Sequence, residues 1–232
     1  MLIAAARWLT ARLRLPLVLS ELGASAGLNL LWDQYALQVG GQRFGPREAA
    51  LTLTPEWRGP LPPPDRPLIA ARAGVDLNPL DPLADRLRLL SYIWPDQPDR
   101  LERAEVALDL AARLRPPIAP GDAVAWLAGP LAPMPGRLHL IYHTVVWQYL
   151  PAESQRRGEA QLDAAGARAT PEAPLARLAM EGDGLDDGAA NTLQIWPKGD
   201  VLAMGRVDFH GRWLNWVAPA PEGRLSPTVG PG

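Results

Sequence analysis

The sequence contains no cysteine, so it can form neither a disulfide nor a thiolate zinc site, and it has no cysteine nucleophile. An excess of charge of one sign is also missing, because 23 Lys and Arg residues face 25 Asp and Glu residues, a net charge of -2. Such a balance gives little attraction to phosphate backbones or anionic lipids. Nucleic acid and membrane are therefore not expected partners. The absence of cysteine agrees with a reducing compartment, so the cytoplasm is the expected location.

A long uninterrupted hydrophobic run is absent as well. The first apolar stretch is broken by Arg7, Arg12 and Arg14, which is too much charge for a span of roughly 20 apolar residues. No charged segment precedes it, so it does not have the form of a signal peptide. The stretch predicts a helix followed by a buried strand over residues 15–20.

Apolar runs separated by many prolines and glycines predict the remaining elements. The first half is expected to contain a glycine loop at 21–27, a helix starting at 28–32, a hairpin over 35–44, a strand at 51–54, a proline-rich loop at 59–67 and a strand at 68–75. A helix beginning at Asp81 is expected to turn Leu83, Leu87 and Leu90 inward. The second half is expected to contain a helix at 99–113, a Gly121-Asp122 turn, a strand at 138–142, a helix at 153–165 and strands at 175–180, 192–196 and 201–207.

These elements predict one α/β domain over residues 1–217, with a loose Pro/Gly tail at 218–232. Strands that alternate with helices favour a mainly parallel sheet covered on both faces, and the last two strands favour an antiparallel finish. Ligands of such sheets bind beyond the carboxyl ends of the strands.

The segment from Glu21 to Asn29, ELGASAGLN, follows the first strand and is the leading candidate for a ligand loop. Gly23 and Gly27 allow close backbone approach, and Glu21 can accept hydrogen bonds. The pattern resembles the first motif of S-adenosylmethionine-dependent methyltransferases, acidic-x-Gly-x-Gly-x-Gly, with Ser25 in place of the middle glycine. The resemblance implies a doubly wound, mainly parallel, seven-stranded Rossmann-like sheet with a C-terminal antiparallel hairpin and S-adenosylmethionine as cofactor.

Three further stretches follow in the order of that superfamily, and the first two of them contain an acid. Asp76, with Leu77, resembles the acid that binds the ribose hydroxyls after the second strand. Asp122, with Ala123, resembles the acid near the adenine after the third. The implied cofactor-binding residues are Glu21, Gly23, Ser25, Gly27, Asn29, Asp76, Leu77, Asp122 and Ala123.

The spacing departs from the usual pattern, because Asp76 lies 55 residues after Glu21 and a ribose-binding acid normally follows after roughly 20. Residues 35–67 are therefore expected to be an inserted β-hairpin and proline-rich loop after the first helix. If this segment instead supplies the second strand, Asp76 loses its assignment.

The fourth strand resembles the one whose tip lies near the transferred methyl group. There His143 is the candidate catalytic base and Tyr142 a candidate catalytic partner. Trp147, Gln148 and His210 are candidates for binding a small-molecule substrate. The three histidines of the chain have no metal-ligand spacing, so no metal is predicted.

Five segments together resemble a bacterial family known only as a domain of unknown function (DUF2332). They are ELGASAGLNLLWDQY, GVDLNPLDP, WPDQ, YHTVVWQYLP and DFHGRWLNW, and the likeness extends to Val217. It implies a family but no reaction. Members of the family tend to be longer at the amino end, so a helical cap over the ligand is expected to be missing from this chain.

Other interpretations of the same residues stay open. Gly23, Ser25 and Gly27 also satisfy G-x-S-x-G, the nucleophile elbow of α/β hydrolases, with Asp200 or Asp208 and His210 downstream. The elbow normally follows several strands, whereas here one helix and one strand precede it. A dinucleotide dehydrogenase is disfavoured because G-x-G-x-x-G is absent.

The candidate residues also have purely structural interpretations. The loop glycines permit a tight turn, Asp76 and Asp122 suit turns and helix caps, and His143 suits a buried hydrogen-bonded position. A non-catalytic ligand-binding or assembly protein with the same fold is therefore the alternative function. The sequence gives no oligomeric state.

Overall fold

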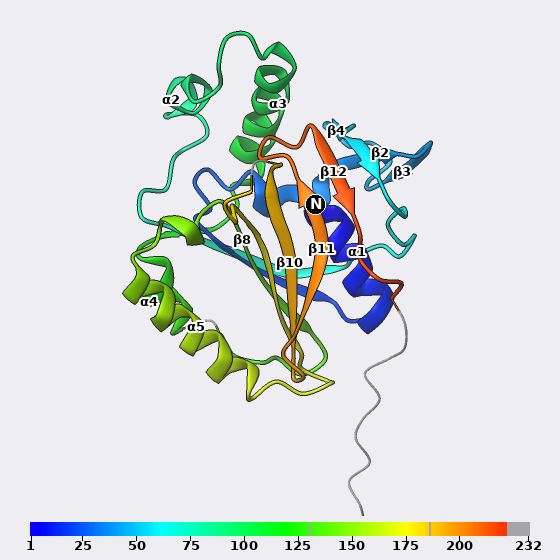
Figure 1. Ribbon diagram of the computed structural model, residues 1–232. Helices are drawn as coiled ribbons and strands as arrows, with labels where there is room; N and C mark the ends of the chain where they lie inside the picture. The colour runs from blue at the N-terminus through cyan, green and yellow to red at the C-terminus, as the bar shows by residue number, and fades with distance from the viewer. Residues whose placement is uncertain (130, 186, 222–232) are drawn as a thin grey trace, which may run out of the picture.

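Nine strands form one sheet in the computed structural model, which describes residues 1–129, 131–185 and 187–221 (Figure 1). The strand order is β5-β12-β11-β10-β9-β8-β1-β6-β7. Five neighbours run parallel: β7 (Ile118–Pro120), β6 (Ile69–Asp76), β1 (Leu17–Leu22), β8 (Leu138–Thr144) and β9 (Leu175–Glu181). The antiparallel strands β10 (Ala189–Trp196), β11 (Asp200–Val207) and β12 (Trp213–Trp216) follow, and β5 (Glu56–Arg58) pairs parallel with β12.

The expected α/β class with a mostly parallel sheet is confirmed, but the expected seven strands are nine. The two additional strands are β12 and β5, which lie at one end of the sheet. Each has at most four residues, too few to stand out as a periodic pattern. The order β7-β6-β1-β8-β9 corresponds to 3-2-1-4-5 in chain order among the parallel strands, which is the order of doubly wound sheets.

The central strand β1 is buried along its whole length because both of its faces are covered. Leu17 and Leu19 belong to the larger hydrophobic core on one face, and Leu22 belongs to a second core on the other. This explains the continuous apolar run, which is typical of parallel strands enclosed between helix layers.

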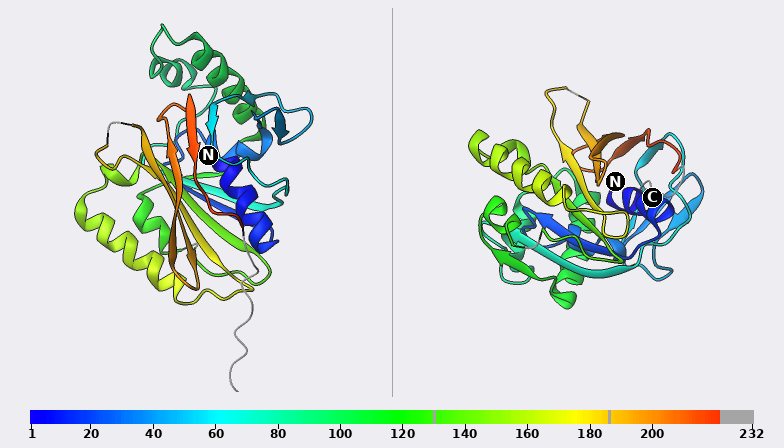
Figure 2. Two further views of the ribbon diagram at one scale, coloured as in Figure 1. Left: turned by 45° about the vertical axis from the view of Figure 1, so that its right-hand side comes forward. Right: turned by 90° about the horizontal axis from the view of Figure 1, so that it is seen from below.

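Helices cover the two faces unequally (Figure 2). The larger core contains residues of α1 (Leu2–Leu13), the 3-10 helix η1 (Asn29–Gln34) and α3 (Pro98–Leu114). The second core contains residues of α4 (Ala123–Leu127) and α5 (Ala152–Gly166). The region expected to be inserted contains a separate small sheet of β2 (Ala36–Val39), β3 (Gln42–Phe44) and β4 (Thr52–Leu53), in the order β3-β2-β4.

The helix expected from Asp81 differs from the prediction. Helix α2 (Arg86–Ser91) begins later and has no buried residue. Leu83 and Leu87 are 56% and 84% exposed, so their expected inward orientation is wrong. Leu90 does pack inward as expected, toward Leu108 and together with Leu89, and a turn over residues 82–85 precedes α2.

Smaller differences concern the segment after β1 and the end of the chain. The helix expected at 28–32 is a 3-10 helix, η1. Most of the expected tail, residues 222–232, lies outside the described residues. Among the described helices, none has both the length and the apolar character that crossing a membrane requires.

Candidate functional site

The candidate site lies at the carboxyl edge of the parallel strands, beside the contact between β1 and β8. In the β1–β8 register Glu21 is opposite Tyr142 and Leu22 is opposite His143. The connection after β1 packs on the larger core, whereas α5, which follows β8, packs on the second core. Adjacent strands whose connections leave to opposite faces open a crevice at their ends, and ligands bind there in α/β proteins.

The loop after β1 is tied to the end of β6. The backbone N–H groups of Gly23 and Ala24 donate to the carbonyl oxygen of Val75, and the Ser25 N–H donates to Asp76 Oδ2 at 2.8 Å. Gly23 and Gly27 have φ angles of +70° and +75°, which favour glycine. Asp76 therefore lies at the end of the strand next to β1, and residues 35–67 do not take that place.

A carboxyl group with an unpartnered oxygen is buried at the end of β1. Glu21 is 2% exposed, and its Oε2 has no hydrogen-bond partner among the described residues. Burial raises the pKa of Glu21 well above its ordinary value, and Asp76 adds to this, while a hydrogen bond from Asn29 opposes it. The protonated form is therefore favoured, and an orphaned buried oxygen of this kind calls for a further partner.

The other two acids of the predicted cofactor set are engaged by the backbone. Besides Ser25, Asp76 accepts from the N–H of Asn78 at 2.9 Å. Asp122 caps the N-terminus of α4 by accepting from the N–H of Ala125 at 2.8 Å. Next to these acids, Leu77 is 76% exposed and Ala123 is buried. Both acids thus have the cap and turn contacts of the structural interpretation, and their part in cofactor binding stays a prediction.

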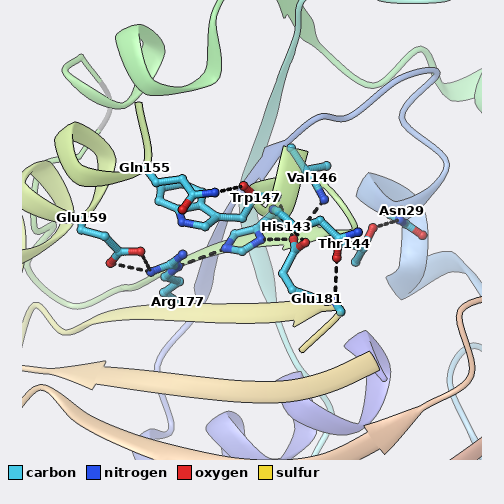
Figure 3. Close-up of polar contacts among 11 residues, drawn as sticks. Asn29, His143, Thr144, Val146, Trp147, Gln155, Glu159, Arg177 and Glu181 are labelled. Carbon is cyan, nitrogen blue, oxygen red and sulfur yellow. Dashed lines mark hydrogen bonds and ion pairs between the residues drawn. The ribbon is translucent and has the colours of Figure 1, made fainter. Parts of the chain in front are cut away.

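A buried polar network surrounds His143 at the end of β8 (Figure 3). Its Nδ1 lies 2.6 Å from Glu181 Oε1, and its Nε2 accepts from Arg177 Nε at 3.0 Å. Arg177 also bonds both carboxylate oxygens of Glu159 on α5 at 2.7 Å. Burial lowers the pKa of His143, and Arg177 adds to this while Glu181 opposes it. In this arrangement neither ring nitrogen of His143 is free to contact a substrate, and its catalytic role stays a prediction.

Glu181 anchors the turn that follows β8. Its Oε1 accepts from the backbone N–H groups of Val146 and Trp147, each at 3.0 Å, and its Oε2 accepts from that of Gln148 at 3.3 Å. Burial raises the pKa of Glu181, but the hydrogen bonds from His143 and the backbone outweigh burial and lower it overall. The turn contains Val145 at φ +57°, a left-handed conformation that costs a β-branched residue about 1–3 kcal/mol.

Trp147, a predicted substrate contact, faces away from open space. It begins the 3-10 helix η2 (Trp147–Tyr149) and stacks on His143 with ring centroids 5.1 Å apart. The Arg177 guanidinium lies over the same indole at 4.3 Å. Gly158 of α5 is pressed against the other part of the ring, where a Cβ would come within 2.4 Å of it. The indole thus covers the polar network.

A cavity of about 920 Å³ lies on the face that carries α1 and α3. Asn29, Thr144 and Gln148 line it at the sheet edge, and His210 lines it from the turn after β11. Asn29 also donates to Thr144 Oγ1 at 3.3 Å. The cavity therefore meets the loop at Asn29, whereas Glu21 is not among its lining residues.

Tyr142 lies between the loop and the polar network. It is buried, and its hydroxyl donates to the carbonyl oxygen of Asn29 at 3.2 Å. Burial raises the pKa of Tyr142 well above its ordinary value, and Glu21 adds to this. The phenol is therefore a neutral donor that holds Asn29 at the cavity wall.

The hydrolase interpretation requires a histidine against Ser25. Ser25 has φ +51°, which resembles a strained elbow. Among the described residues, however, His139 bonds Ser20 Oγ at 2.8 Å and His143 bonds Glu181 and Arg177. His210 is exposed at the cavity, where its backbone N–H donates to Asp208. No described contact joins Ser25 Oγ to any of these rings.

Sequence reasoning missed Glu181, Arg177 and Glu159. Glu181 follows the predicted strand 175–180 directly, so the rule that selected Glu21 and Asp76, an acid at the end of a strand, would have found it. Arg177 and Glu159 carry no such signal, because their contacts depend on strand register and on the seating of α5.

A comparison with protein families matches residues 1–216 to the family described as "Uncharacterized protein conserved in bacteria (DUF2332)". No curated protein matches the chain. The family match covers every described strand and helix, so all of the geometry above lies within it.

Proposed function

The chain belongs to the DUF2332 family of bacterial proteins, and we propose that it is an S-adenosylmethionine-binding, methyltransferase-like enzyme that acts on a small acceptor. The observation that carries the proposal is Glu21, a buried acid with an orphaned oxygen at the end of the central parallel strand. Beside it, a glycine loop connects to Asp76 at the end of the neighbouring strand. These two acids flank a loop with positive φ angles, at the place where the connections of neighbouring strands leave to opposite faces of the sheet. Such an arrangement suits a polar nucleoside ligand.

The orphaned oxygen of Glu21 also tests whether the residues fit this cofactor. A protonated Glu21 can both donate and accept, which suits the amino or hydroxyl groups of a nucleoside-like molecule. Asp76 and Asp122, at the ends of β6 and β7, would bind the remaining polar groups of the cofactor. Gly23 and Gly27 would allow the backbone of the loop to come close to it. When bound, S-adenosylmethionine supplies a methyl group on a positively charged sulfur.

The chain's own residues then orient the acceptor. Asn29, Thr144 and Gln148 present amide and hydroxyl groups to the cavity where it meets the loop. Tyr142 and the network around Glu181 hold these groups in place from behind. Correct alignment of two reactants can itself lower a barrier by several kcal/mol, about 7–11 at best, so positioning is the main contribution proposed for the protein.

His143 is the candidate base, and its test needs a readout beyond folding. Proton uptake at Nε2 requires release of the Arg177 contact. His143→Gln should therefore lower turnover and flatten its pH dependence without changing S-adenosylmethionine affinity. Unchanged turnover would remove the catalytic role and leave His143 as a positioning residue for Glu181.

A non-catalytic ligand-binding or assembly protein with the same fold is the second candidate. The observation that favours it is the same His143, whose two ring nitrogens are both occupied. This candidate predicts ligand binding without transfer to any acceptor in a broad screen.

Calorimetric titration with S-adenosylmethionine, S-adenosylhomocysteine and NAD tests the proposal. The two sulfur compounds should bind and NAD should not. Asp76→Asn should weaken binding about tenfold or more, the loss expected for a hydrogen bond to a charged group. Asp81→Asn is the matched control, because Asp81 also accepts backbone N–H groups in a turn but lies outside the site. Absence of binding by both sulfur compounds would refute the proposal.

A further inference from the structure

Two arginine side chains of α3 line the cavity one helical turn apart. Arg100 and Arg103 are both half-buried. Arg100 donates to the neutral side chain of Gln97 at 2.7 Å, and Arg103 makes no hydrogen bond or ion pair within the described residues. Burial lowers the pKa of Arg100, and the charge of Arg103 adds to this. Like charges at this spacing repel, and partial burial increases the cost.

Among the described residues no acid forms an ion pair with Arg100 or Arg103, although the charge of Asp208 acts on Arg100 and raises its pKa. Asp208 also lines the cavity, but its carboxylate accepts from the Arg212 guanidinium at 2.7 Å and from the N–H groups of His210 and Arg212. Burial raises the pKa of Asp208, yet these contacts outweigh burial and lower it to about 2. Its charge is therefore already satisfied, and this end of the cavity keeps an excess of positive charge.

The rest of the wall is mostly apolar. Apolar side chains from several elements and loops contribute to it, among them Leu28, Trp32, Leu53, Val145, Met180 and Leu214. The volume of about 920 Å³ is in the range of small-molecule sites, roughly 300–1,000 Å³. A fully polar anion would leave these apolar side chains facing water, so the wall selects a ligand with an apolar body.

From this arrangement we infer that the cavity binds an apolar molecule with one carboxylate, which Arg100 and Arg103 recognise. The guanidinium groups pair with the carboxylate, and the apolar body lies along the wall toward Met180 and Thr144. If the proposed function holds, this ligand is the methyl acceptor. Binding of the carboxylate in the cavity does not depend on the proposed function, because Glu21 and Asp76 do not line the cavity.

Calorimetric titration with decanoate, in the absence of S-adenosylmethionine, tests the inference. Decanol and decyltrimethylammonium have the same chain with a neutral or a positive head. Decanoate should bind most tightly, and Arg103→Gln should weaken it about tenfold or more, the loss expected for a charge-assisted pair. Arg113→Gln is the matched control, because Arg113 is on the same helix but is exposed and does not line the cavity.

The decanol titration of Arg103→Gln separates loss of charge from loss of structure. Decanol affinity should stay unchanged, because an alcohol carries no charge. The inference would be overturned if Arg103→Gln weakened decanol binding as much as decanoate binding. It would also be overturned if the three ligands bound equally well to the unaltered protein, or if Arg103→Gln and Arg113→Gln had equal effects on decanoate binding. Decanoate binding by a protein that fails to bind S-adenosylmethionine would refute the proposed function alone, and the reverse result would refute this inference alone.

Discussion

Arg177 donates a hydrogen bond from Nε to Nε2 of His143 across 3.0 Å. A guanidinium has no acceptor and stays protonated, so Nε2 must be the unprotonated nitrogen of the ring. Nδ1 then carries the proton and donates it to Glu181 at 2.6 Å. The contact thus defines a neutral imidazole in one tautomer.

Replacing Arg177 should raise the pKa of His143. Burial is the largest cause of its lowered pKa, and the positive charge of Arg177 is a further one. In Arg177→Gln that charge is lost while Glu181 remains, so protonation of the ring becomes easier. Nitrogen chemical shifts of the imidazole, followed by NMR against pH, measure this. Arg156→Gln, which removes an exposed arginine from α5, should leave the titration of His143 unchanged; an equal shift in both variants would contradict the assignment.

Glu181→Ala should destabilise the protein by about 2–4 kcal/mol, because it leaves the N–H groups of Val146 and Trp147 and the Nδ1 of His143 without their acceptor. Denaturant unfolding measures the loss. Hydrogen exchange at Val146 and Trp147 should also become faster. Glu153→Ala is the control, because its ion pair with Arg156 is exposed and should contribute less than about 1 kcal/mol. Unaltered exchange at both amides would show that Glu181 does not hold the turn.

Gly23→Ala should cost more stability than Gly136→Ala, although the two glycines have nearly equal φ angles of +70° and +72°. A Cβ at position 136 meets nothing within 4 Å, so that variant measures the backbone cost alone, about 1–2 kcal/mol. A Cβ at position 23 would come within 2.4 Å of Val146 Cγ2. Adding Val146→Ala to Gly23→Ala relieves the contact.

The readout is the free energy of unfolding of the two single variants, of Val146→Ala alone and of the double variant. The double variant should be more stable than the sum of its single changes predicts. Strict additivity would mean that the loop after β1 and the turn after β8 are not in steric contact at positions 23 and 146.

The free energy of unfolding should fall in acid because of His139. This residue is 1% exposed, and burial lowers its pKa to about 4. Between the unfolded value, about 6.5, and about 4, the unfolded chain binds a proton that the folded protein does not. The contribution is therefore complete above about pH 6.5 and is lost as the pH falls through this window, by about 3 kcal/mol in total.

Urea unfolding at a series of pH values measures this slope. In His139→Asn the free energy of unfolding should depend less on pH between 6.5 and 4, whatever the stability of this variant at neutral pH. In His210→Asn, which replaces an exposed histidine, the pH dependence caused by His139 should remain. An unchanged slope in His139→Asn would assign the acid sensitivity to other groups.

The ends of most parallel strands could be predicted from the sequence, because β1, β6, β7 and β9 end in, or are followed by, glycine or an acid, whereas β8 is followed by Val145. This locates Glu21 and Asp76 at the same edge, with Tyr142 and His143 between β1 and β9. Asn29, Gln148 and His210 line the cavity. Their roles in cofactor and substrate binding stay predictions.

The partners of His143 could not be predicted, because they depend on register. In the β8–β9 pair His143 is opposite Ala179 and Ile141 is opposite Arg177. His143 and Arg177 are therefore diagonal neighbours on one face, two residues apart in register. A shift of one residue would turn Arg177 to the other face, and the apolar pattern alone does not determine that register. The exposed face of α2 has a similar cause, since periodicity does not show which partner a helix meets.

The edge strand β5 has a consequence for how the chain acquires its structure. Within the part of the chain that the structure describes, β5 pairs with β12 alone, and Trp57 lies against Trp216 with ring centroids 5.9 Å apart. Trp8 of α1 donates to the carbonyl oxygen of Pro219 at 2.6 Å. Contacts that join segments more than 150 residues apart slow folding, because the intervening chain must be ordered before they form. During synthesis, the contacts that β5 and Trp8 make with this region can therefore form only after residues 213–219 have left the ribosome.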